Sequence, residues 1–137
     1  KHGYGEVAEG LLFDDLHGYM KGFIDLVFKH DGRFYIADYK SNDLGAQVED
    51  YAVERLHHPM MSAKYPLQYL LYTLALHRYL KNRLPDYDYA RDFGGVFYLF
   101  LRGIRAERSA PAGVWRDRPP WALIEAMDVL MEGAGDD

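Results

Sequence analysis

The sequence predicts an α/β domain in which a sheet built around one β-hairpin is flanked by helices. Two runs rich in Phe, Ile, Val and Tyr surround the pair Asp31-Gly32, whose residue types suit the positive φ angles of a tight hairpin turn. An apolar stripe at helical spacing follows Pro66. The nearly continuous apolar run over 94–104 is typical of a strand buried on both faces.

Composition excludes several classes of protein. Among the 137 residues, 49% are hydrophobic and 15% aromatic, which speaks against disorder and is enough to fill the core of one domain. The net charge of −5 gives no overall basic signature of nucleic-acid binding, so any contact with DNA must be local. Without cysteine the chain has no disulfide, zinc ribbon or cysteine-ligated iron–sulfur cluster. It shows neither a signal peptide nor an apolar run near the roughly 20 residues of a membrane span.

The predicted hairpin consists of strands over 22–29 and 33–40, and residues 11–20 could extend its first strand. With Asp31 and Gly32 in the turn, cross-strand partners have numbers that sum to 63, so Asp25 is expected opposite Asp38. Alternation then places Asp25, Asp38 and Lys40 on one face of the hairpin. The turn-forming residues over 41–45 are expected to end the second strand.

This carboxylate pair is the first candidate site. Like charges directly opposite one another destabilise a sheet, and Asp is a poor strand former. A divalent cation would resolve the conflict, because hard cations take carboxylate oxygens as ligands. Lys40 brings an ammonium group to the same face. The alternative is an ordinary Lys–Asp pair on the surface of a solvated hairpin.

Two helical segments are expected next. The segment 48–64 is predicted to be helical with an interruption at Pro59, and the adjacent His57 and His58 are expected to face solvent rather than share a metal. The helix that begins at Pro66 and ends before Pro85 is expected to bury a stripe made of Leu67, Leu70, Leu71, Leu74 and Ala75.

On the second of these helices, Gln68 and Tyr72 lie four residues apart and therefore on one face. They form either a polar rim on a core helix or a pair that points toward the candidate site on the hairpin.

The remaining segments complete the sheet and close the domain. The stretch 87–93 is expected to be an aromatic, charged connector, and 94–104 a buried strand. Residues 106–118 are predicted to form a loop. A closing helix over 121–131 is expected to pack on the sheet through Leu123, Ile124, Met127, Leu130 and Met131.

The order of these motifs resembles a known family. KGFIDLVF followed by DYKSN is similar to the GxxD…DxK signature of the PD-(D/E)xK nuclease superfamily, and QYLLYTLALHRYL carries the QxxxY spacing of its RecB-like members. With YDY and FGGVFYLFLRG, the match runs in order from Gly18 to Met131. The resemblance implies a restriction-endonuclease-like core: a mixed sheet with a catalytic β-hairpin, flanked by helices. Residues 1–137 are expected to be the C-terminal part of a RecB-like nuclease domain, without its upstream helices and helicase domains.

The resemblance also implies roles for residues of the hairpin. Asp25 and Asp38 match the acidic metal ligands, and the backbone carbonyl of Tyr39 matches a main-chain ligand. Lys40 matches the catalytic lysine, which orients or activates the attacking water and offsets charge on the scissile phosphate. The implied cofactor is Mg²⁺, for which Ca²⁺ or Mn²⁺ can substitute in crystals, with no iron–sulfur cluster.

The implied substrate is DNA, as single strands delivered by a helicase. Gln68 and Tyr72 match the motif that contacts DNA. The implied partners are the RecC and RecD subunits of a helicase–nuclease in the bacterial cytoplasm, with RecA as a further partner and no membrane.

One family feature is missing from the chain. RecB-like nucleases use another ligand, a histidine on a helix well upstream of the GxxD strand, but only 24 residues precede Asp25. Neither His2 nor His17 has a comparable setting. We therefore expect the isolated chain to bind Mg²⁺ weakly, to have little nuclease activity, and to leave apolar sheet surface uncovered.

Two alternatives share parts of this pattern. Iron–sulfur members of the superfamily, such as AddAB-type nucleases, share the motifs but need cysteines, which this chain lacks. The second is a non-catalytic module with a nuclease-like fold that docks RecA, for which the aromatic residues Tyr87 and Tyr89 suggest a surface. Retention of Asp25, Asp38 and Lys40 together favours catalysis.

Overall fold

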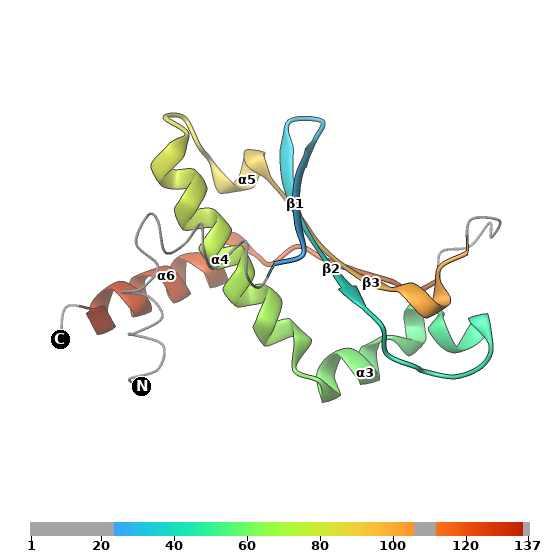
Figure 1. The fold of residues 1–137 in the computed structure, drawn as a ribbon. Coiled ribbons are helices and arrows are strands. Elements are labelled where there is room, and N and C mark those ends of the chain that lie inside the picture. The colour runs from blue at the N-terminus through green and yellow to red at the C-terminus, as the bar shows by residue number, and fades with distance from the viewer. Residues whose placement is uncertain (1–23, 106–111, 136–137) are drawn as a thin grey trace.

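The computed structural model describes residues 24–105 and 112–135 (Figure 1). The possible strand over 11–20 and the first two residues of the predicted strand over 22–29 lie outside this range. The elements in chain order are β1 (Leu26–His30), β2 (Arg33–Lys40), η1 (Val48–Tyr51), η2 (Val53–Arg55), α3 (His57–Ser62), α4 (Tyr65–Arg83), α5 (Tyr89–Asp92), β3 (Phe93–Phe100), η3 (Leu101–Gly103), β4 (Val114–Asp117) and α6 (Trp121–Gly135).

The hairpin has the predicted register. Val27 pairs with Ile36 and Lys29 with Phe34, and the turn residues Asp31 and Gly32 have φ angles of 49° and 79°. The first strand begins later than predicted, at Leu26, so residue 25 lies just before the ladder instead of inside it. The second strand ends at Lys40, before the expected turn cluster.

The four strands form one mixed sheet in the order β1-β2-β3-β4, as the family resemblance implied. The β2–β3 pair is parallel and the other two pairs are antiparallel. Strand β3 ends at Phe100 rather than at residue 104, because the chain turns through η3. A Cβ on Gly103 would lie 2.2 Å from the Cβ of Tyr51, so this turn approaches η1 at a position that needs glycine.

Strand β4 corrects the prediction of a loop over 106–118, of which 106–111 lie outside the described residues. Its four residues, VWRD, alternate between the faces and pair with β3. A short edge strand is held by backbone hydrogen bonds to its neighbour, so its sequence does not need the apolar run that marks a buried strand.

The two faces of the sheet differ. One face is buried under α4 and carries Ile36, Val96, Tyr98 and Phe100, all of which are fully buried. Figure 1 shows α4 and α6 gathered on one side of the sheet. On the opposite face, the Phe28 ring stacks on those of Tyr35 and Phe97, and the latter two rings are tilted by 37° to each other. Leu26 and Tyr39 on this face are 40% and 43% exposed.

Helix α4 has the predicted limits, with Pro66 in its first turn, but its buried side differs from the predicted stripe. Leu67 is exposed, while Leu74 and Ala75 are buried as expected. The side that meets the sheet includes two tyrosines, Tyr69 and Tyr72. Tyrosine has a large apolar ring, and a hydrogen bond at its hydroxyl allows full burial.

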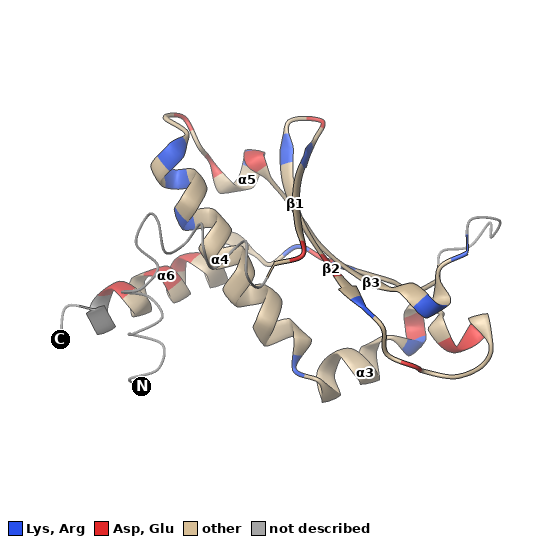
Figure 2. Cartoon of the chain, viewed as in Figure 1, with Lys and Arg blue, Asp and Glu red and all other residues tan. Residues whose placement is uncertain are grey.

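Helix α6 packs on α4 rather than directly on the sheet. Arg78 of α4 donates from Nε to the Asp128 carboxylate at 2.5 Å and from Nη2 to the Asp128 carbonyl at 3.1 Å. Ile124 and Met131 are buried as predicted, but Leu123 and Leu130 are exposed. Figure 2 shows the acidic residues along α6 and the basic residues in the last turns of α4.

The segment 48–64 is three short helical pieces rather than one interrupted helix. The first break comes at Ala52, which forms an isolated bridge with Ala112, and Pro59 lies in the first turn of α3 instead of causing the interruption. His57 and His58 are exposed, as predicted.

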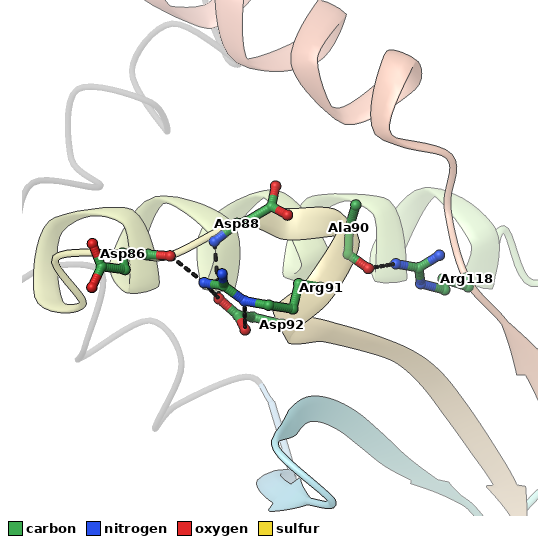
Figure 3. A network of polar contacts seen from close by, with 6 residues as sticks. All are labelled: Asp86, Asp88, Ala90, Arg91, Asp92 and Arg118. Carbon is green, nitrogen blue, oxygen red and sulfur yellow. Dashed lines mark hydrogen bonds and ion pairs between the residues drawn. The ribbon is translucent and has the colours of Figure 1, made fainter.

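The connector between α4 and β3 is fixed by the polar network in Figure 3. Arg91 donates to the Asp86 carbonyl and to the Asp92 carboxylate, and Arg118, just past β4, donates to the Ala90 carbonyl at 2.8 Å. The guanidinium of Arg91 lowers the pKa of the Asp92 carboxyl. These contacts fix α5, which precedes β3, next to the residue that follows β4.

The proposed aromatic surface at Tyr87 and Tyr89 is wrong. Tyr89 is buried, its hydroxyl donates to the Pro119 carbonyl at 2.5 Å, and its ring stacks on Phe93. Tyr87 is mostly buried and lies against His77. Both rings are core residues rather than a docking surface. Among the helices of the described residues, none combines the length and apolar composition needed to cross a bilayer.

Candidate active site

Asp38 and Lys40 lie at the end of β2 on the face that α4 covers. The Lys40 ammonium is 3.1 Å from the Asp38 carboxylate, and only 15% and 5% of these two side chains is exposed. The pair is therefore enclosed, which excludes an ordinary ion pair on a solvated hairpin. Burying a charged group is unfavourable unless it has partners, so the surroundings of this pair matter for stability.

Asp25 lies beside this pair, just before β1. Its Oδ2 accepts a hydrogen bond from the Tyr39 amide at 2.8 Å, which ties the bend at the start of β1 to β2. Burial raises the pKa of the Asp38 carboxyl; Lys40 opposes this rise, and the neighbouring Asp25 carboxylate adds to it. The predicted proximity of the two carboxylates is thus present, although Asp25 lies outside the ladder.

Gln68 reaches the same site from α4. Its Oε1 accepts hydrogen bonds from the Lys40 ammonium at 3.2 Å and from the Tyr98 hydroxyl at 2.5 Å. Tyr72 is buried one turn further along the helix. The pKa of the Tyr98 hydroxyl is raised mainly by burial, with smaller contributions from Asp38 and then Tyr72. Of the two predicted helical residues, Gln68 contacts Lys40 directly, and Tyr72 is close enough to influence Tyr98.

Two residues of the site were missed by the sequence analysis. The Lys40 ammonium lies 4.2 Å from the ring centroid of Tyr65, in the first turn of α4, and 5.2 Å from that of Tyr98, on β3. Tyr65 precedes Gln68 by three residues, which is a helical-face spacing that could have indicated it. Tyr98 pairs with Asp38 across the parallel strands, but no pattern in the sequence sets that register.

The donor atoms suit a hard divalent cation. Asp25 and Asp38 supply carboxylate oxygens and the chain at Tyr39 supplies a carbonyl, which are the ligand types that Mg²⁺ prefers. In the part of the chain that the structure describes, no group of three or more His, Cys, Asp or Glu side chains converges on one point. The described side chains thus provide an incomplete shell, and water fills the remainder in typical Mg²⁺ sites.

Comparison with known proteins agrees with these motifs. The profile described as PD-(D/E)XK nuclease superfamily matches residues 2–127. The chain is 54% identical over 121 residues to the RecBCD enzyme subunit RecB of Haemophilus influenzae, 50% over 123 residues to that of Escherichia coli, and 44% over 131 residues to that of Mycobacterium tuberculosis. These alignments cover 88%, 90% and 91% of this chain but only 10%, 10% and 12% of those relatives.

Proposed function

Because the chain belongs to the PD-(D/E)XK nuclease superfamily, we propose that it hydrolyses phosphodiester bonds in DNA with the aid of Mg²⁺. The observation that carries the proposal is the enclosed Asp38–Lys40 pair with Asp25 beside it. A lysine and a carboxylate are expensive to bury, and a purely structural hairpin needs neither this pair nor a second carboxylate beside it.

In this proposal Asp25, Asp38 and the Tyr39 carbonyl hold the ion. A bound divalent ion supplies Lewis acidity, which lowers the pKa of a coordinated water and favours negative charge on phosphate oxygens. Burial raises the pKa of the Asp38 carboxyl, so a proton would compete with the ion for its oxygens as pH falls.

Lys40 supplies positive charge where negative charge grows on the scissile phosphate. Its ammonium is largely shielded from water, and a fixed charge acts more strongly in such surroundings than in bulk solvent. Gln68 orients the ammonium through its Oε1. Among the described residues no hydrogen bond is made by its amide nitrogen, which we propose donates toward the DNA. Tyr72, one turn further along α4, is proposed to act with Gln68 in contacting the DNA.

The wider setting is also a proposal, because the chain spans about a tenth of the length of the relatives it matches. We propose that residues 1–137 are the C-terminal part of a nuclease domain in a RecBCD-type helicase–nuclease, an exodeoxyribonuclease V. This enzyme would act in the cytoplasm of a bacterium, with RecC and RecD as partner subunits. Its roles would be double-strand break repair and degradation of foreign DNA, and RecA is a further proposed partner.

The test is Mg²⁺-dependent cleavage of single-stranded DNA by the longest natural polypeptide that contains this chain. Cleavage is expected to vanish with chelator and with Asp38→Asn. The matched control is Asp31→Asn, which changes the exposed turn aspartate and keeps a residue type that tolerates positive φ. Equal loss in both variants, or cleavage that survives Asp38→Asn, would contradict the assignment.

The same assay on the 137-residue chain alone is expected to show weak Mg²⁺ binding and little activity. The described residues offer two carboxylates and one carbonyl, whereas Mg²⁺ favours near-octahedral coordination. Equal specific activity of the chain and of the longer polypeptide at equal Mg²⁺ would show that these residues form a complete site.

A further inference from the structure

The rings of Tyr65 and Tyr98 both lie near the Lys40 ammonium. The Tyr65 ring centroid is 4.2 Å and the Tyr98 ring centroid 5.2 Å from the ammonium. The two rings are 5.4 Å apart and inclined at 50°, so they form a corner around the cation. A cation within about 6 Å of a ring centroid is attracted by the ring quadrupole, most strongly where water is excluded.

Both rings are held from outside the corner. The Tyr98 hydroxyl donates to Gln68 at 2.5 Å, and its ring stands on the central strand β3. The Tyr65 hydroxyl donates to Asn42 Oδ1 at 3.2 Å, and its ring also packs near Phe100. The corner is thereby fixed to β3, to the first turn of α4 and to the loop after β2.

We propose that Tyr65 and Tyr98 are positioning residues that hold the Lys40 ammonium in place for catalysis. This inference rests on the proposed nuclease function and adds to it the groups that aim the lysine. A lysine side chain is a flexible four-carbon stem with a point charge, so it needs external restraint.

Besides the hydrogen bond from Lys40 to Gln68, Asp38 restrains this lysine, but its carboxylate would also hold the metal ion in the proposed function. The aromatic corner does not compete with the ion for any ligand. We therefore expect the rings to keep attracting the ammonium when an ion is bound.

Tyr65 gives the cleaner test, because Tyr98 also anchors Gln68. In the longest natural polypeptide that contains this chain, Tyr65→Phe keeps the ring and removes only the hydrogen bond to Asn42. Tyr65→Leu removes the ring. We expect kcat to stay near wild type for Phe and to fall about 5- to 30-fold for Leu, since a desolvated cation–π contact of this kind changes an equilibrium by that factor. The Mg²⁺ requirement and KM for single-stranded DNA are expected to change little.

A graded series separates attraction from packing. Phenylalanines carrying one, two or three fluorines at position 65 withdraw charge from the ring face while nearly preserving its shape, so kcat is expected to fall stepwise with fluorine number. In a Lys40→Ala background, Tyr65→Leu is expected to have no further effect. The matched control is Tyr79→Leu, which removes a tyrosine from the same helix that lies 4.9 Å from a different cation, Arg83.

A measurement without activity completes the test. In the metal-free 137-residue chain labelled at the lysine ε-carbons, the Lys40 ε-proton signal is expected upfield of the other lysines. The ring current of residue 65 should keep this signal upfield in Tyr65→Phe, and the signal should move toward those of the other lysines in Tyr65→Leu. A flat fluorine series, additive effects of the Lys40 and Tyr65 substitutions, or an unshifted Lys40 signal would overturn the inference. Absence of cleavage by the wild-type protein would instead overturn the nuclease proposal, and the NMR signal would still decide whether the corner holds Lys40.

Discussion

At the scale of single residues, Asp38 combines burial with a nearby like charge, and both raise its pKa above the ordinary value of 3.8. A carboxyl whose pKa is higher in the folded than in the unfolded chain destabilises the fold as it ionises. Stability of the metal-free protein is therefore expected to fall as pH rises from about 3.8 through the raised pKa of the folded state. The proton also competes with the metal, so Mg²⁺ affinity should weaken as pH falls through the same window.

Asp38→Asn removes the buried charge and keeps the shape of the side chain. In chelator near neutral pH, we expect its melting temperature to equal or exceed that of wild type, with a gain of up to about 1 kcal/mol from relief of the like-charge contact. The Asn carbonyl can still accept from Lys40. Thermal unfolding followed by circular dichroism from pH 4 to 8 checks this, and a large drop in melting temperature without metal would show that Asp38 is instead a structural ion-pair partner.

Lys40→Ala addresses the other half of the pair. We expect the cleavage rate to fall roughly 10²- to 10³-fold, the usual loss when one preorganised electrostatic contact is removed. Mg²⁺ binding measured by calorimetry should be retained, since the ligands are oxygens of other residues. Lys29→Ala is the control, because Lys29 is an exposed lysine on the same hairpin. Loss of metal binding with near-normal cleavage would mean that the roles are wrongly divided.

Part of this site could be predicted from the sequence. The alternation along the strands and the Asp-Gly turn predicted that Asp25, Asp38 and Lys40 lie close together. The observed register confirms the predicted turn. The aromatic corner could not be predicted, since it depends on how β3 aligns with β2 in parallel and on how α4 lies against the sheet. Both are set by packing between distant segments rather than by local pattern.

At the scale of elements, the junction of α4, α6 and the connector encloses a histidine. His77 is buried against the rings of Tyr87, Tyr89 and Trp121, and its Nδ1 lies 3.0 Å from the Tyr87 hydroxyl. Within the described part of the chain, its Nε2 is buried and has no hydrogen-bond partner. Burial lowers the pKa of this imidazole; Asp128 opposes the shift, and the nearby basic groups of α4 add to it.

A histidine whose pKa is lowered by folding contributes stability above its unfolded pKa of about 6.5, and that contribution is lost as pH falls below this value. We predict that the wild-type chain loses stability between pH 7 and pH 5 with a slope of up to about 1.4 kcal/mol per pH unit from this residue. His77→Phe keeps an aromatic ring and should flatten that slope. Denaturant unfolding at several pH values is the measurement, and parallel curves for the two proteins would exclude His77 as the cause.

Elements with a clear local signal were predicted, and elements held by distant contacts were not. The turn residues and Pro66 indicated the hairpin and the start of α4 correctly. The predicted apolar stripe on α4 contained leucines and an alanine but no tyrosine. Tyr69 is nevertheless buried, because its hydroxyl donates a hydrogen bond to Asp117 at 2.5 Å. Strand β4 was missed because a four-residue edge strand is specified by its neighbour.

At the scale of the whole molecule, the described elements cover the two faces of the sheet unevenly. Helix α4 buries the face with the candidate site, while the other face leaves Leu26 and Tyr39 more than a third exposed around the Phe28–Tyr35–Phe97 stack. Arg116 lies 5.2 Å from the Phe97 ring and shields part of it. Apolar area exposed in one continuous patch favours association over solvation.

We therefore predict that the isolated 137-residue chain self-associates in a concentration-dependent way. Leu26→Lys places a charge on the uncovered face at an edge strand, which should shift the chain toward monomer because charged edge residues oppose both apolar contact and strand pairing. Leu130→Lys is the matched control: Leu130 is 74% exposed but lies on α6, away from the sheet. Light scattering coupled to size exclusion across a range of concentrations measures the mass of each protein. If the wild-type chain stays monomeric throughout, or if both lysine variants shift it equally, the uncovered face is not what drives association.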